Sequence, residues 1–173
     1  MVDVDASMMK TRAGQKSKIA LVTLNSLVVT ENVISGLICR QIPPFQRKTV
    51  TTYRVDDFAD NLVPILSESA SVVIVDSASS GTEKGAVVIY DLTNLKNLER
   101  TPQVFREQIA KIANSIRTSR NQSGLPRRAI FFGVTLENSQ AKAIEPGCEA
   151  FDSSVTDNLS LLLGKVLMSC SGE

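Results

Sequence analysis

Two acidic side chains, Glu31 and Asp76, follow apolar runs that are typical of buried strands. Asp76 comes directly after residues 72–75, so we expect its carboxylate at the mouth of a sheet, partnered by a cation, a metal or backbone donors. The alternative is an aspartate that caps the following turn, and the spacing favours neither. Glu31 lies in the first turns after a strand that ends near Asn25, where the helix macrodipole alone would favour an acid. If both carboxylates converge, they could hold a divalent ion or share acid–base work.

The chain contains no histidine, which excludes several classes of chemistry. Ser-His-Asp and Cys-His mechanisms are ruled out, and so is a histidine-based zinc site built within this chain. The cysteines Cys39, Cys148 and Cys170 are widely spaced and form no C-x-x-C pair, so they make no case for a structural zinc or a redox dithiol. They fit a reduced compartment, where free cysteines behave as small apolar residues. We therefore expect a cytoplasmic protein.

Phosphate-binding and basic motifs give weaker signals. The loop at 79–85 lacks the spacing of a phosphate-binding loop, and no G-x-G-x-x-G follows the first predicted strand. Arg106 and Arg117 are eleven residues apart and so share one face of a predicted helix. That face is either solvated, which is the commoner outcome, or a binding patch for an acidic partner or a peptide carboxylate.

The chain of 173 residues predicts one α/β domain that positions these groups. The order of the predicted strands and helices along the chain indicates a three-layer α/β/α sandwich, with a five-stranded and mostly parallel sheet between helices on both faces. One strand is expected to be antiparallel, because the loop before it is too short for a helical crossover. The apolar run at 72–75 has no polar face, so it cannot form an edge strand. The predicted strands span 18–24, 49–55, 71–76, 86–90 and 128–134, and the helices span 28–42, 57–66, 102–117 and 154–169.

Residues 1–17 read as a flexible N-terminal tail and residues 18–173 as the folded domain. The formal net charge of +1 provides no field that would steer the protein towards nucleic acid. No apolar stretch approaches ~18 residues, so we expect no membrane partner either.

Three segments resemble the hydrogenase maturation endopeptidases, which trim the C-terminal extension from the large subunit of nickel-iron hydrogenases. The predicted element order also fits from Lys18 onwards. The segments are 24–31; 72–81 with 84–87; and 130–138, which runs on to 147–150 and 153–155. This resemblance implies a phosphorylase/hydrolase-like α/β fold and a metal-dependent endopeptidase.

The resemblance also implies where a metal would bind. Glu31 and Asp76 fall on two of the family's three metal-binding positions. The third is a histidine in the family; by spacing it falls near Phe105, with Gln103 and Glu107 as the nearest oxygen donors. We expect no tightly bound metal, because nickel favours imidazole over oxygen-only sites. The metal concerned would be the nickel of the client protein.

The partner implied by the resemblance is a client metalloprotein, such as a hydrogenase large-subunit precursor. Asn25, Arg106 and Arg117 are the candidate substrate-binding residues. The alternative is a non-catalytic relative that keeps the fold as a binding or assembly module.

Overall fold

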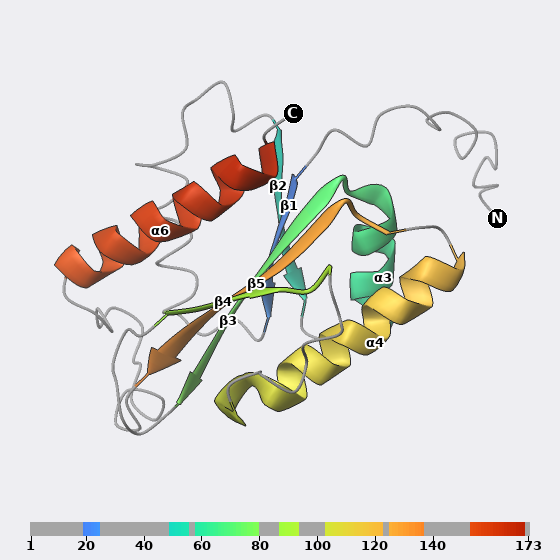
Figure 1. Cartoon of the computed structure of the whole chain (residues 1–173), viewed down its shortest axis with the longest axis horizontal. Coiled ribbons are helices and arrows are strands. Elements are labelled where there is room, and N and C mark those ends of the chain that lie inside the picture. The colour runs from blue at the N-terminus through green and yellow to red at the C-terminus, as the bar shows by residue number, and fades with distance from the viewer. Residues whose placement is uncertain are drawn as a thin grey trace, which may run out of the picture.

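A five-stranded sheet forms the centre of the computed structural model, which describes residues 19–24, 49–55, 58–79, 87–93, 103–122, 125–136 and 153–171. The strand order is β2-β1-β3-β5-β4, and all neighbouring pairs are parallel except β4 with β5 (Figure 1). The strands are β1 (Ile19–Leu24), β2 (Val50–Val55), β3 (Ser71–Ser79), β4 (Val87–Asp91) and β5 (Arg128–Leu136). The predicted sheet is therefore confirmed, including its single antiparallel strand.

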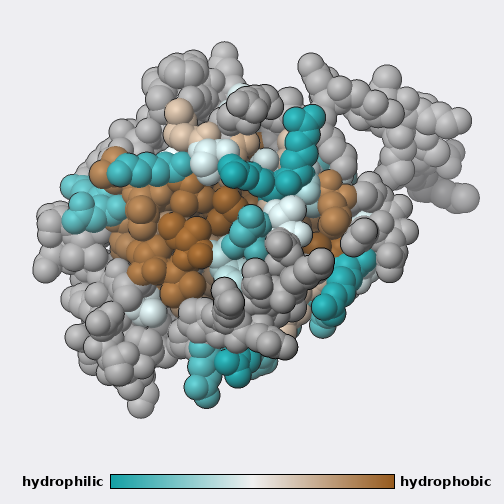
Figure 2. Space-filling view, in the orientation of Figure 1, coloured by the Kyte–Doolittle hydropathy of each residue, from teal (hydrophilic) through white to brown (hydrophobic). Residues whose placement is uncertain are grey.

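β3 lies in the middle of the sheet because its apolar run must be covered on both sides. Residues 71–76 are all buried, and so is every residue of β1. β4 is an edge strand, and its Ile89 is 48% exposed. Figure 2 shows apolar surface over the region of β4 and the neighbouring flank of α6 (Ser153–Ser171). The prediction that residues 72–75 would not lie at an edge is confirmed.

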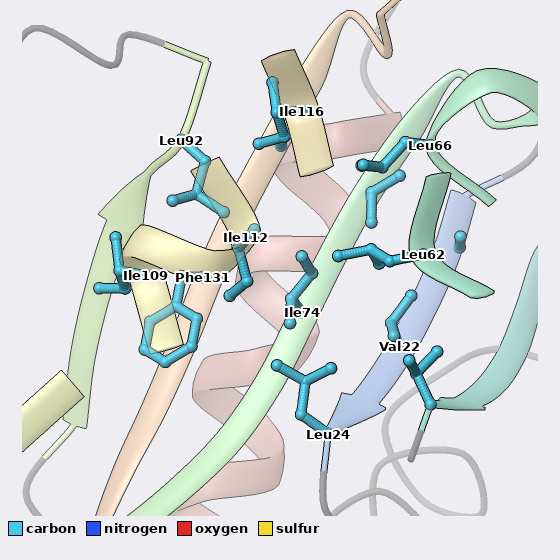
Figure 3. Close-up of a cluster of buried hydrophobic side chains, with 14 of the residues drawn as sticks. Val22, Leu24, Leu62, Leu66, Ile74, Leu92, Ile109, Ile112, Ile116 and Phe131 are labelled. Carbon is cyan, nitrogen blue, oxygen red and sulfur yellow. The ribbon is translucent and has the colours of Figure 1, made fainter. Parts of the chain in front are cut away.

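Helices cover both faces of the sheet, which confirms the three-layer architecture. Successive side chains of β3 point to opposite faces of the sheet. Val73 and Val75 pack with α6, whereas Val72 and Ile74 pack with the opposite layer. That opposite layer contains α3 (Phe58–Glu68), the 3₁₀ turn η4 (Gln103–Phe105) and α4 (Arg106–Gln122) (Figures 1 and 3). Within the described ranges, no helix is long and apolar enough to cross a membrane.

Several element boundaries differ from those predicted. β3 was expected to end at Asp76 and to be followed by a loop, but it continues through Ser79. Its extra residues pair with the end of β5, from Ser77 with Val134 to Ser79 with Leu136. Pairing with a neighbouring strand thus overrides a local composition of small residues that is typical of loops. The helix predicted at 28–42 lies outside the described residues.

Substitutions in α6 test whether this helix packs into the core through its buried leucines. Leu163 is fully buried, whereas Leu161 on the same helix is 45% exposed. We expect Leu163→Ala to lower the free energy of unfolding by about 2–5 kcal/mol, because it leaves a cavity in the core. Leu161→Ala is the matched control and should change it by less than about 0.5 kcal/mol. Urea denaturation measures both, and equal losses would contradict the packing described.

Candidate functional site

Asp76 lies within the sheet, not at the tip of its strand. Its register partner on β5 is Gly133, and Gly133 in turn pairs with Val88 on β4. On the other side Thr23 pairs with Val75, so Leu24 ends β1 level with Asp76. Asp76 is only 2% exposed. The carboxylate is therefore near the carboxyl end of the parallel strands, but enclosed by its neighbours.

The alternation of strand residues shows which face Asp76 serves. Ile74 and Phe131 both belong to the core beneath α3 and α4. Because residues two apart in a strand point to the same face, Asp76 and Gly133 face this layer as well. Side chains at such paired positions would stand about 4.8 Å apart, but Gly133 has none. The space beside Asp76 on the β5 side must be filled by another element.

The ring of Phe105, from η4, fills that space. A Cβ atom added at Gly133 would lie 2.8 Å from both Cε2 and Cζ of Phe105, and 2.8 Å from Cε1 of Phe131. Phe105 is fully buried, and its ring meets Phe131 edge-to-face, with centroids 5.2 Å apart and planes at 67°. Only glycine allows so close an approach. Phe105 thus covers Gly133, the register partner of Asp76.

Asp76 is a buried acid whose two carboxylate oxygens differ in their surroundings. Its Oδ2 atom is enclosed and makes no hydrogen bond to the described residues, although Asp76 does take part in another interaction. In the part of the chain that the structure describes, no three His, Cys, Asp or Glu residues gather as a metal site. Divalent cations in proteins take four or more ligands, so Asp76 could hold one only together with donors from outside the described residues or from a bound partner.

The candidate third ligands, Gln103 and Glu107, are turned to solvent. Gln103 is exposed at the start of η4. Glu107 has a 79% exposed side chain, and its Oε1 lies 2.9 Å from Nζ of Lys111. The hydrogen bond and the positive charge of Lys111 hold the pKa of Glu107 below its usual value. Neither residue joins Asp76, and the residue between them that does approach the site is Phe105.

The two candidate arginines lie on the outer side of α4. Arg106 follows Phe105 directly, and both Arg106 and Arg117 are exposed. Nη1 of Arg117 donates a hydrogen bond to Oδ1 of Asn114 at 3.4 Å. Eleven residues of helix separate the two backbone positions by about 16 Å along the axis, and of the two only Arg106 adjoins Phe105 in the chain.

Of the remaining candidate residues, the structure describes Cys170 but neither Glu31 nor Asn25. Glu31 and Asn25 lie outside the described residues, so the convergence of Glu31 with Asp76 stays a prediction. Cys170 packs against the core beneath α6, and burial raises the pKa of its thiol. A thiol of this kind is a poor nucleophile at neutral pH, in line with its interpretation as a small apolar residue.

The pair formed by Phe105 and Gly133 is the feature that sequence reasoning missed. A glycine inside an apolar strand pattern, such as residues 128–134, is a recognised sign of close backbone approach. Phe105 stood out only as the position near which the family's histidine falls by spacing, because a buried aromatic at the start of an amphipathic helix is otherwise ordinary core.

No family model matches this sequence, and neither does any curated protein. Solved structures do match. An endopeptidase from Escherichia coli, determined in solution, aligns with a TM-score of 0.56 at 14% identity, over 88% of this chain and 91% of that chain. The hydrogenase maturating endopeptidase HybD from E. coli aligns with a TM-score of 0.50 at 12% identity, over 88% of this chain and 93% of that chain. This chain has the fold of these endopeptidases. The resemblance drawn from three sequence segments is thereby confirmed at the level of the fold.

Substitution of Gly133 tests the contact beside Asp76. Gly133→Ala forces the Phe105 ring to move, so we expect a loss of about 1–3 kcal/mol in the free energy of unfolding. In a Phe105→Leu background the two ring atoms of Phe105 are gone and only the close contact with Cε1 of Phe131 remains, so the same substitution should cost clearly less. A double-mutant cycle in urea measures this coupling. An equal penalty in both backgrounds would show that Phe105 does not rest on Gly133.

Proposed function

We propose that this chain is a hydrogenase maturation protease-like endopeptidase, which cleaves the C-terminal extension of a hydrogenase large-subunit precursor or a similar metalloprotein. The observation that supports this proposal most directly is Asp76: a buried carboxylate, near the carboxyl end of the central strand, in a fold shared with endopeptidases. In open α/β sheets, ligands bind beyond the carboxyl ends of the strands. The widely spaced cysteines suit the reducing cytoplasm as its location.

In this proposal the metal belongs to the substrate. Asp76, together with Glu31, contacts the nickel that the client already carries, so the client's own ligands complete the coordination shell. Arg106, exposed at the start of α4, is placed to receive a carboxylate of the client's tail through its planar guanidinium. Asn25 and Arg117 would contact the client further out. The chain thus recognises a loaded client by a metal that it does not itself hold.

An isosteric substitution of Asp76 tests the proposed function. Asp76→Asn removes the charge and preserves the shape, so processing of a nickel-loaded precursor should fall by at least about 100-fold, while the fold stays intact. The measurement is the intact mass of the precursor after incubation, which records the loss of its C-terminal tail. Unimpaired cleavage by the Asp76→Asn variant would contradict the proposal.

Asp91→Asn is the matched control, because Asp91 lies at the opposite end of the sheet. It pairs with Ile130, is exposed, and its Oδ1 accepts a hydrogen bond from the backbone N–H of Thr93 at 2.8 Å. This variant should process the precursor as the unmodified chain does. If the unmodified chain binds the precursor stably and never cleaves it, the alternative, a non-catalytic assembly module, replaces the endopeptidase.

A further inference from the structure

β4 forms one edge of the sheet, and half of its backbone groups point away from β5. The backbone N–H of Leu92 donates to the carbonyl oxygen of Ala129 at 2.7 Å, so these residues continue the antiparallel ladder as a hydrogen-bonded pair. Such pairs recur at every second residue. The backbone groups of Ile89, three residues before Leu92, therefore point outward, and so do those of Val87. Within the described residues, no hydrogen bond to these outward groups is found.

The side chains of β4 add apolar surface to this open edge. Val88 and Tyr90 are partly buried against the core beneath α3 and α4. Ile89 pairs with Phe132, which belongs to the core beneath α6, so Ile89 faces that side, where it is 48% exposed. β4 lies between α6 and α4 in Figure 1, and Figure 2 shows apolar surface reaching from β4 to the neighbouring flank of α6. An exposed edge strand with an apolar side chain is a template for pairing with another strand.

The two edges of the sheet differ in the residues that they expose. The exposed residues of β2 are Thr52 and Arg54, and polar or charged side chains on an edge strand oppose the addition of another strand. β4 has the sequence VVIYD, with its single charge on Asp91 at the end of the strand. An uncharged run of β-branched and aromatic residues is the composition that favours association with a strand of the same kind. β4 therefore lacks the protection that β2 has.

We propose that β4 is a dimer interface, at which it pairs antiparallel with β4 of a second copy of this chain about a two-fold axis close to Ile89. This pairing is self-complementary, because each outward N–H of one strand meets an outward C=O of the other, and the two sheets become continuous. The formal net charge of +1 leaves little repulsion between two copies. A strand of five residues buries less area than a standard interface, so the dimer is weak and depends on concentration.

Sedimentation velocity between about 10 µM and about 1 mM protein measures this dimer, and the unmodified chain should shift from monomer to dimer over that range. Ile89→Lys places like charges opposite each other near the axis, so dimerisation should weaken by at least about 10-fold. Thr52→Lys is the matched control, because it adds the same charge at the other edge of the sheet, and it should dimerise as the unmodified chain does. If Ile89→Lys fails to fold, Ile89→Thr keeps the branched side chain, removes apolar surface and takes its place.

Amide hydrogen exchange at low and high protein concentration tests whether the contact is strand pairing. The N–H of Ile89 should exchange more slowly in the dimer, whereas the N–H groups of Val88 and Tyr90, which already bond to β5, should change little. Leu161→Lys, on the exposed surface of α6, should leave the dimer intact.

Three results would overturn the proposal. The first is an unmodified chain that stays monomeric over the whole concentration range, which would leave the edge to an extended segment of a different protein. The second is a dimer in which the N–H of Ile89 gains no protection. The third is a dimer that Leu161→Lys breaks and Ile89→Lys does not, which would assign the contact to α6.

Discussion

The pairing of β3 with β5 is the interaction on which the arrangement of this site depends. The two strands run parallel from Ser71 with Arg128 to Ser79 with Leu136, well past Asp76. This pairing sets Asp76 level with Gly133, and the missing side chain of Gly133 admits the ring of Phe105. A slip of β3 by one residue would turn Asp76 to the α6 face, and a slip of β5 by one residue would place a bulky residue beneath Phe105.

The central sheet could be predicted from the sequence because its signals are local and strong. The apolar residues 72–75 demand burial on both faces, and the short connection before β4 demands an antiparallel strand. The end of β3 could not be predicted, because Ser77 and its small neighbours follow the pairing offered by β5 and not their own propensities. Phe105 was missed for a related reason: its role arises from Gly133, which lies 28 positions away in the chain.

A buried carboxylate among apolar groups is costly unless something compensates its charge. Sites of this kind are kept where the charge serves a ligand or a reaction. In the proposed function the buried carboxylate of Asp76 serves the substrate, whose nickel ion is already held by client ligands. This account explains why a chain without histidine can still act on a metalloprotein: the imidazole that would strengthen a resident nickel site is not needed when the client supplies the other ligands.

The most direct measurement compares one precursor in two states, with and without its nickel, in the presence of the unmodified chain. Intact mass records whether the C-terminal tail is removed from each. The account predicts that the tail is lost from the nickel-loaded precursor and retained on the metal-free one, because Asp76 is engaged only through the client's metal. Equal cleavage of both precursors would contradict it.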